Sequence, residues 1–265
     1  MARKKTNALD LRTDDIMLEQ SQMFGHNLNF AAAEAYKLLR TNIAFSFSGS
    51  DQHRVVGVTS AQRGEGKSLT SMNIAYALAE TGKEILLIEG DMRIPTMGTR
   101  LNLNTKPGLS NLLVGMNSVS GAVQQYAVSM DDGKILAFDV MVSGDVPPNP
   151  SELLSSERFA ALLGKLRERY DYIILDLPPV TAVTDAAIAS RLVDGMLVVV
   201  REGRAQRSAL SESMRQLRLA DAHVIGFVYN GVSEKGGYYR KGYYKKGYYA
   251  SDYYRKSDPN DAAWN

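Results

Sequence analysis

The chain has 265 residues, 45% of them hydrophobic, and a formal net charge of +2. It is long enough to bury one large core, and its charge is too small to make the whole molecule a binder of nucleic acid or membranes. Cysteine is absent, which excludes disulfides, thiol catalysis and zinc–thiolate sites. The basic stretch MARKK is followed by polar residues, and no run approaches the ~20 apolar residues of a membrane-spanning helix, so we expect neither secretion nor a membrane span.

The order of predicted elements indicates an α/β fold. Residues 1–30 are expected to be flexible, and residues 31–47 to form a helix that opens a single domain, 31–232. Within this domain, apolar runs alternate with amphipathic segments at 68–80, 152–169 and 208–220. The apolar runs are RVVGVTS, EILLIEG, ILAFDVMV, DYIILDL, GMLVVV and HVIGFVY. Such strands, separated by helices, predict a mostly parallel sheet that helices cover on both faces.

The first apolar run leads directly into SAQRGEGKSLT, which has the features of a phosphate-binding loop. Glycines let backbone NH groups turn toward phosphate oxygens, and the following helix adds positive potential at its N-terminus. Lys67 can reach the β- and γ-phosphates, and the Ser68 hydroxyl can hold Mg²⁺. The strict pattern has glycine where this chain has Ala61. The predicted nucleotide site consists of Gln62, Arg63, Gly64, Glu65, Gly66, Lys67, Ser68 and Leu69.

Acidic side chains follow two other predicted strands. Asp176 ends the run YIILD, whereas Glu89 and Asp91 follow the run ILLI. Arg93 stands two residues further along the chain. Each of these residues, taken alone, could cap a turn or lie in a solvated loop. Because ligands bind at the carboxyl ends of the strands in such sheets, their joint occurrence predicts that the three carboxylates converge on one metal–phosphate centre.

These motifs resemble those of the bacterial tyrosine kinases, a branch of the phosphate-loop ATPases. The resemblance runs from about residue 34 to residue 232 and rests on SAQRGEGKS, ILLIEGDMR, YIILDLPP and PPNPSELLSS. Two positions depart from the family pattern, which usually has proline where Arg63 stands and aspartate where Glu89 stands. The resemblance implies the phosphate-loop fold, ATP and Mg²⁺ as cofactors, and phosphoryl transfer to tyrosine.

The resemblance also implies a role for each site residue. The residue matching Glu89 draws the proton from the incoming tyrosine, and Ser68, Asp91 and Asp176 organise Mg²⁺. Lys67 and Arg93 stabilise the transferred phosphoryl group. Glutamate adds a methylene to the family aspartate, which would set the base up to ~1.5 Å further out. We expect this change to affect the rate more than the reaction class, because phosphoryl transfer depends mainly on positioning and charge.

Residues 233–265 are expected to form a disordered tail. The segment 235–256 holds seven Lys or Arg against one acidic residue, a net charge of +6. Such a segment could be a low-complexity adhesive strip or a site for single-stranded nucleic acid. Joined to a kinase domain, its tyrosines become substrates, and the resemblance implies that a neighbouring protomer phosphorylates them. The predicted sites are the paired tyrosines Tyr238, Tyr239, Tyr243, Tyr244, Tyr248, Tyr249, Tyr253 and Tyr254.

The helix predicted at 31–47 contains Glu34, Lys37 and Arg40 in an ExxKxxR arrangement. From the residues alone, this is the solvated face of an amphipathic helix. The family has a closely similar ExxRxxR stretch that packs protomers into a ring, which implies a homo-oligomer, expected to be an octamer. Lys37 lacks the bidentate fork of arginine, so we expect a weaker interface.

The resemblance further implies partners and a place in the cell. We expect a cytoplasmic kinase that a membrane-spanning adaptor of the polysaccharide-chain-length type recruits to the inner face of the plasma membrane. It would control capsule or exopolysaccharide synthesis and export, act on further protein substrates, and be reversed by a protein-tyrosine phosphatase; no nucleic acid is expected.

Two alternatives remain open at this point. One is a switch ATPase of the partition or positioning type, and the other is a nucleotide-regulated module that binds nucleic acid through the basic aromatic tail. The positioning ATPases carry an extra lysine where this chain has Gln62, and they lack a tyrosine tail. Both differences favour the kinase.

Overall fold

The structure, a computed structural model, describes residues 24–47, 53–130 and 133–232. Most of the predicted flexible N-terminal segment and the whole tyrosine tail lie outside the described residues. None of the helices in the described part is long and apolar enough to cross a membrane.

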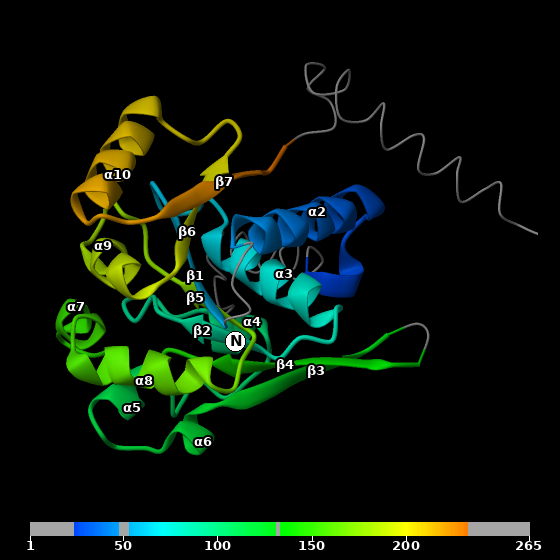
Figure 1. The fold of residues 1–265 in the computed structure, drawn as a ribbon, viewed down its shortest axis with the longest axis vertical. Coiled ribbons are helices and arrows are strands. Elements are labelled where there is room, and N and C mark those ends of the chain that lie inside the picture. The colour runs from blue at the N-terminus through cyan, green and yellow to red at the C-terminus, as the bar shows by residue number, and fades with distance from the viewer. Residues whose placement is uncertain (1–23, 48–52, 131–132, 233–265) are drawn as a thin grey trace, which may run out of the picture.

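A single sheet forms the centre of this part of the chain (Figure 1). Its seven strands lie in the order β3-β4-β2-β5-β1-β6-β7. Every neighbouring pair is parallel except β3 and β4, which run antiparallel. The predicted α/β fold with a mostly parallel sheet is therefore confirmed. The strands are β1 (Arg54–Ser60), β2 (Ile85–Glu89), β3 (Gln124–Ser129), β4 (Ile135–Met141), β5 (Tyr172–Asp176), β6 (Gly195–Arg201) and β7 (Val224–Asn230).

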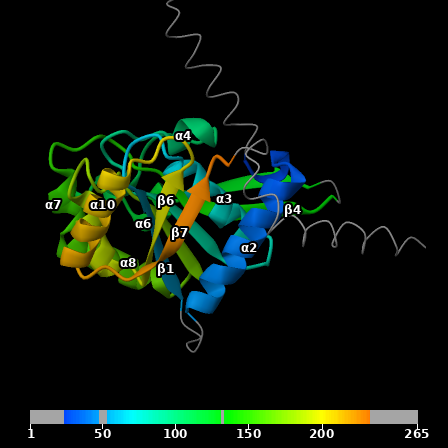
Figure 2. The ribbon, with the colours of Figure 1, turned by 90° about the horizontal axis from the view of Figure 1, so that it is seen from above.

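Helices cover both faces of the sheet. Figure 1 shows α2 and α3 on one side and α8, α9 and α10 on the other, and Figure 2 shows β7 at the edge between α10 and α2. The α-helices are α2 (Phe30–Ser46), α3 (Lys67–Ala79), α4 (Met97–Arg100), α5 (Leu109–Leu113), α6 (Val119–Ala122), α7 (Pro150–Leu154), α8 (Glu157–Arg167), α9 (Asp185–Ala189) and α10 (Arg207–Leu219). Short 3₁₀ turns occupy Gly25–Asn27 and Ser190–Leu192.

The apolar runs supply two cores because successive side chains of a strand point to opposite faces. On β2, Leu86 and Ile88 join the core beneath α5 and α7–α10, whereas Ile85 and Leu87 join the core beneath α2 and α3. A strand buried on both faces needs an unbroken apolar run, which is why these strands were visible in the sequence.

The strand that the sequence analysis missed is β3, at the edge of the sheet. Its sequence QQYAVS is half polar, and its residues alternate between partly buried and exposed. It pairs antiparallel with β4 and extends the sheet beyond the phosphate-loop core. An edge strand of this kind has no continuous apolar run to reveal it.

The packed part of the chain begins before the expected domain boundary at residue 31. Phe24 is only 8% exposed. Its ring lies edge-on to Tyr76 and Tyr126, with centroid separations of 5.8 and 5.5 Å. At Gly25, φ is +58° and a Cβ would lie 2.7 Å from the Tyr76 ring, so only glycine fits there. The residues that precede α2 therefore pack against the outer surface of α3.

Candidate active site

The phosphate loop joins the end of β1 to the start of α3. Gly66 has a φ of +94°, and a Cβ there would lie 2.0 Å from the side-chain nitrogen of Asn230. The Glu65 side chain is buried under the loop, where Oε2 accepts a hydrogen bond of 2.7 Å from the Gln62 NH. Gln62 and Glu65 therefore shape the loop, whereas the other predicted loop residues line the adjoining pocket.

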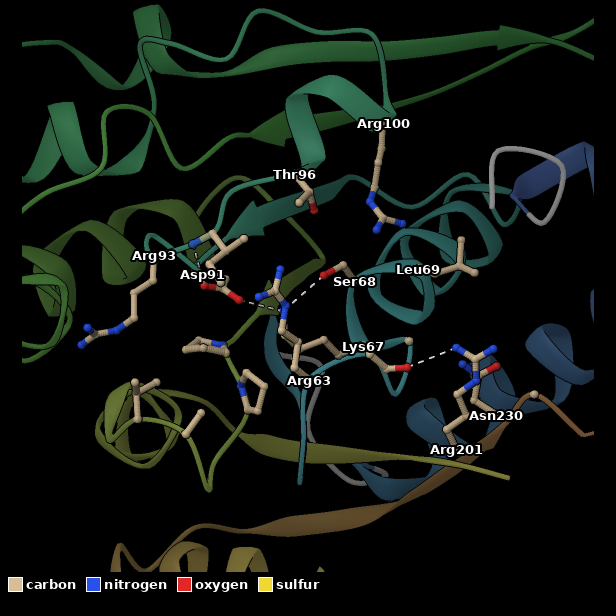
Figure 3. A pocket seen from close by; sticks show the side chains of 18 residues that line it. Arg63, Lys67, Ser68, Leu69, Asp91, Arg93, Thr96, Arg100, Arg201 and Asn230 are labelled. Carbon is tan, nitrogen blue, oxygen red and sulfur yellow. Dashed lines mark hydrogen bonds and ion pairs between the residues drawn. The ribbon is translucent and has the colours of Figure 1, made fainter. Parts of the chain in front are cut away.

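The pocket lies at the carboxyl ends of the strands, as the strand-end motifs predicted (Figure 3). It is surrounded by the phosphate loop, the segment between β2 and α4, the turn after β5 and the ends of β6 and β7. Its lining residues are Arg63, Gly64, Gly66, Lys67, Ser68, Leu69, Asp91, Arg93, Ile94, Thr96, Arg100, Pro178, Pro179, Ala182, Val183, Arg201, Asn230 and Gly231.

Lys67 lies between two carboxylates at the centre of the site. Its Nζ is 2.9 Å from Asp91 Oδ2, 3.9 Å from Asp176 Oδ2 and 3.3 Å from Ser68 Oγ. Burial lowers the pKa of Lys67, but attraction to Asp176 and Asp91 outweighs burial and leaves the pKa above its ordinary value. Lys67 therefore stays charged, as a phosphate ligand must. Of the three carboxylates predicted to converge on one centre, Asp91 and Asp176 meet at Lys67.

Glu89 is not placed to act as the base that the sequence analysis expected. It is 2% exposed and does not line the pocket. One carboxylate oxygen accepts hydrogen bonds from the NH groups of Thr96 and Met97, at 2.5 and 2.7 Å, and the other accepts from Ser143 NH at 3.0 Å. Burial raises the pKa of Glu89, and these hydrogen bonds oppose that rise. The carboxylate thus holds the start of α4 instead of facing a substrate.

Arg93 lines the pocket, but its guanidinium is directed away from Lys67 (Figure 3). Its Nε and Nη2 donate to the two carboxylate oxygens of Asp185 at 2.9 and 3.0 Å, and Nη2 also donates to Ser151 Oγ at 3.0 Å. Asp185 is fully buried. These contacts differ from the expected contact with the transferred phosphoryl group, because the buried carboxylate holds Arg93 against the wall of the pocket.

Among the pocket residues that the sequence analysis missed are Arg100, Arg201 and Asn230. Arg201 Nη1 donates to the Gly64 carbonyl at 3.1 Å, and Asn230 Nδ2 donates to the Glu65 carbonyl at 3.0 Å. Both residues end strands that were predicted, so the strand-end rule used for the carboxylates would have found them. Arg100 had no such signal, because it lies on a helix of four residues that the sequence did not reveal.

The residues expected to join protomers make contacts within the chain. Lys37 Nζ pairs with Glu34 Oε1 at 2.8 Å on the exposed face of α2. Arg40 instead turns toward α3, where Nη1 donates to the Ala77 carbonyl at 2.7 Å and lies 3.5 Å from Glu80 Oε2. Arg40 therefore ties α2 to the last turn of α3. Glu34 and Lys37 remain accessible to a neighbouring chain.

Magnesium was expected at Ser68, Asp91 and Asp176. Within residues 24–47, 53–130 and 133–232, no group of three or more His, Cys, Asp or Glu side chains is arranged to hold a metal ion. The expected centre of three carboxylates is therefore absent from this part of the chain, since Glu89 turns away. Ser68 and Asp91 still present oxygen atoms to the pocket, and this donor set fits Mg²⁺, which needs few protein ligands when phosphates supply the rest.

The fold, the glycine loop and the strand-end carboxylates define a nucleotide-binding ATPase of the phosphate-loop class. In agreement, a family model described as an AAA domain matches residues 53–219. Tyrosine-protein kinase YwqD of Bacillus subtilis is 37% identical over 211 residues, which cover 78% of this chain and 86% of the relative.

Two further relatives agree with YwqD. Tyrosine-protein kinase CpsD of Streptococcus agalactiae is 34% identical over 78% of this chain and 85% of its own length. The solved kinase domain of the Escherichia coli tyrosine kinase ETK has a TM-score of 0.74 and 31% sequence identity, with 82% of each chain covered. This chain belongs to the bacterial tyrosine kinases, and the predicted family is confirmed.

Proposed function

We propose that this protein is an ATP-dependent autokinase that transfers the γ-phosphate to the paired tyrosines in the tail of a neighbouring protomer. The observation that carries the proposal is Lys67, charged and held between Asp91 and Asp176 beside a left-handed glycine loop. The same chain supplies acceptors in its tyrosine pairs. Membership of the kinase family supports this activity over a positioning ATPase.

The contacts around the loop support a direction for ATP. The backbone of the loop and the N-terminus of α3 suit the phosphates, with Lys67 at the γ end. Arg201 and Asn230 bond to the loop carbonyls, and Figure 3 shows them on the opposite side of the site from Arg93. We therefore assign them to the nucleoside end of ATP. The acceptor tyrosine would enter from the side of Arg93 and the apolar wall of Ile94 and Pro179.

Ser68 and Asp91 would hold Mg²⁺. Asp176 lies behind them, 1% exposed, and accepts a hydrogen bond of 3.2 Å from Ser71 Oγ. When bound, the ion would neutralise charge on the phosphate oxygens. In the described part of the chain, Asp91 is also the one acidic side chain that lines the pocket, so it replaces Glu89 as the candidate to receive the tyrosine proton.

Further assignments rest on family membership. A homo-oligomeric ring, expected to be an octamer, would bring one protomer's tail to the next active site, with Glu34 and Lys37 on the accessible face of α2. A membrane-spanning adaptor would recruit the kinase to the inner face of the plasma membrane, where phosphorylation would regulate capsule or exopolysaccharide synthesis. A protein-tyrosine phosphatase would reverse the modification.

The test is the intact mass of the purified chain after incubation with Mg-ATP and the cytosolic end of its adaptor. Wild type should gain several phosphates, and fragmentation should place them between Tyr238 and Tyr254. A Lys67→Met variant should gain none, because the charge that holds the γ-phosphate is lost. Lys165→Met, on the exposed surface of α8, should behave as wild type.

The outcome that would remove the proposal is ATP binding without any phosphate on tyrosine in the presence of the adaptor. A switch ATPase would then be the better description. Phosphate on the Lys67→Met chain incubated alone would instead show that another kinase contaminates the preparation.

A further inference from the structure

Arg100 is a cation in the active-site pocket to which neither the family motifs nor the sequence analysis gives a role. It ends α4, the short helix that follows the acidic segment after β2. Figure 3 shows its side chain entering the pocket from α4 and pointing toward Ser68. In the part of the chain that the structure describes, the Arg100 guanidinium has no hydrogen bond or ion pair of its own. Of the other basic groups of the pocket, Arg63 is exposed, whereas Lys67 is paired with Asp91, Arg93 with Asp185 and Arg201 with a loop carbonyl.

The electrostatic surroundings of Arg100 overlap with those of Lys67. Asp176 and Glu89 attract both cations. For Arg100, burial is the larger effect and lowers the pKa, because none of these carboxylates is within bonding distance. A guanidinium held in this way is incompletely compensated, and an anion in the pocket would compensate it.

The backbone that carries Arg100 is held firmly. Glu89 accepts the NH groups of Thr96 and Met97 at the start of α4, and the Arg100 NH donates to the Thr96 carbonyl at 3.0 Å. Met97 is fully buried, and it fixes the apolar side of the helix in the core beneath α2 and α3. The Glu89 side chain therefore connects the end of β2 directly to the turn that presents Arg100.

We propose that Arg100 is a second cation for the phosphoryl group being transferred, opposite Lys67, and that Glu89 is the positioning residue that holds it there. The inference rests on the proposed kinase function and adds a residue to that site. The ligand is a phosphate group with at least two negatively charged oxygens, which is shared by the γ-phosphate of ATP and by a phosphate already on tyrosine. Arginine suits either, because its planar fork can donate to two oxygens at once.

The role requires no proton from Arg100. In the transfer, the bond from the γ-phosphorus to the β–γ bridging oxygen breaks and ADP keeps the electron pair. A bond forms from the tyrosine oxygen to phosphorus, and the phenol proton passes to Asp91. Arg100 and Lys67 would hold the oxygens of the phosphoryl group from two sides while its bonds exchange.

The first experiment measures nucleotide binding by calorimetry, on the full chain with Mg²⁺, for ADP and for the non-hydrolysable analogue β,γ-imido-ATP. Arg100→Gln should weaken the analogue by roughly 10- to 100-fold, the effect of losing a charge-assisted hydrogen bond, and leave ADP within about twofold. Arg100→Lys should recover part of the affinity. Arg218→Gln, at an exposed position near the end of α10, is the matched control and should bind both nucleotides as wild type does.

A second arm titrates phosphotyrosine into the ADP-loaded chain. Loss of phosphotyrosine binding in Arg100→Gln, with the analogue unaffected, would assign Arg100 to the phosphate on the product. Unchanged binding of both ligands, in a variant whose thermal unfolding matches wild type, would overturn the proposal. Glu89→Gln should weaken the same ligand as Arg100→Gln, to a smaller degree, if Glu89 acts by positioning.

The two proposals fail separately. If Arg100→Gln phosphorylates its tail normally and binds both ligands as wild type does, the kinase function is supported and the proposed role of Arg100 is wrong. The opposite result is that Arg100→Gln binds β,γ-imido-ATP no more tightly than ADP, while wild type phosphorylates no tyrosine. Arg100 would then still bind the terminal phosphate, and the proposed kinase function would be wrong.

Discussion

At the scale of single residues, Glu89 is a carboxylate whose contacts are all with the backbone of its own chain. Its carboxylate accepts hydrogen bonds from three backbone NH groups, on Thr96, Met97 and Ser143. A buried donor that loses its acceptor costs free energy, so these bonds make Glu89 part of the fold. A substitution of Glu89 is therefore expected to change the stability of the fold, whether or not it changes the catalytic step.

We expect Glu89→Ala to lower the free energy of unfolding by roughly 3 kcal/mol or more, because three NH groups lose their acceptor. Glu89→Asp should cost less, since a shorter carboxylate can keep some of the bonds. Urea unfolding followed by circular dichroism measures both. Glu84→Ala is the control, because Glu84 lies just before the same strand and is exposed. A Glu89→Ala chain as stable as wild type but inactive would restore the role of base.

Sequence reasoning located residues that the structure brings to one end of the sheet, but it could not set the direction of each side chain. The positions of Lys67, Asp91 and Asp176 follow from strand ends and a glycine loop, so their convergence was predictable. The turning away of Glu89 depends on where α4 begins, and the capture of Arg93 depends on a carboxylate far away in sequence. Neither contact leaves a local pattern.

At the scale of elements, Arg93, Asp185 and Ser151 join three segments that border the pocket. Arg93 follows β2, Ser151 lies in α7 and Asp185 begins α9. The Ser151 hydroxyl donates to Asp185 at 2.6 Å, and both groups bind the Arg93 guanidinium. Because Asp185 is 0% exposed, its charge depends on these two partners. The network fixes how the segment after β2 sits against α7 and α9.

We expect Asp185→Asn to lower the free energy of unfolding by about 1–3 kcal/mol, because a neutral amide replaces one charged acceptor of a bidentate pair while Arg93 keeps access to solvent. Combining it with Arg93→Gln in a double-mutant cycle should give a coupling energy of the same order. Asp221→Asn, at an exposed turn, should change stability little. If the effects of Asp185→Asn and Arg93→Gln on the free energy of unfolding are additive, the interaction between the two side chains contributes nothing to stability.

The segment before α2 is a second case in which an element acts through packing. Phe24 lies among aromatic rings from α3 and β3, so we expect Phe24→Ala to lower the free energy of unfolding by about 3–5 kcal/mol. Chemical denaturation measures this. Phe30→Ala is a matched control, since Phe30 is 67% exposed and should change stability by under about 0.5 kcal/mol. Equal effects of the two variants would contradict the packing role.

The strands were predictable where they carry a continuous apolar run. All six apolar runs are strands of the sheet. Five of them are central strands, which carry apolar side chains on both faces, and the sixth is the edge strand β7, whose run is apolar although Phe227 and Tyr229 are exposed. The edge strand β3 and the short helix α4 follow no such rule. Phe24 was missed because a single aromatic residue in a polar stretch has no periodicity, and its burial is decided by Tyr76 and Tyr126.

At the scale of the whole molecule, the charges of the pocket and of the tail bear on the order in which the nucleotide and the tail enter the active site. Five basic side chains and one acidic side chain line the pocket, and the tail segment 235–256 carries +6. Asp176 and Asp185 offset part of the pocket charge by pairing with Lys67 and Arg93, and we expect the remaining basic side chains to disfavour entry of an unmodified tail into an empty pocket. Bound ATP brings negative charge between them, so the tail should enter after the nucleotide. Each phosphate added to the tail then lowers its charge by about 1.5–2.

Transfer between protomers can be tested by mixing two full-length variants. Lys67→Met keeps the acceptor tyrosines and lacks the loop lysine, whereas a chain with all eight tail tyrosines changed to phenylalanine keeps the active site and lacks acceptors. We expect neither to gain phosphate alone, and the Lys67→Met chain to gain several when the two are mixed with Mg-ATP. Intact mass distinguishes the chains, because their substitutions give them different masses.

The control for this mixture replaces the phenylalanine variant with one that also carries Lys67→Met, and it should produce no phosphate on either chain. A further check is concentration: transfer between protomers should speed up per chain as the mixture is concentrated, until the oligomer is fully formed. If the Lys67→Met chain stays unmodified beside an active wild type that modifies itself, each chain phosphorylates its own tail. The pocket would then have to receive a tail that starts at the end of its own β7, and the exposed face of α2 with Glu34 and Lys37 would lose its role in bringing acceptors to the site.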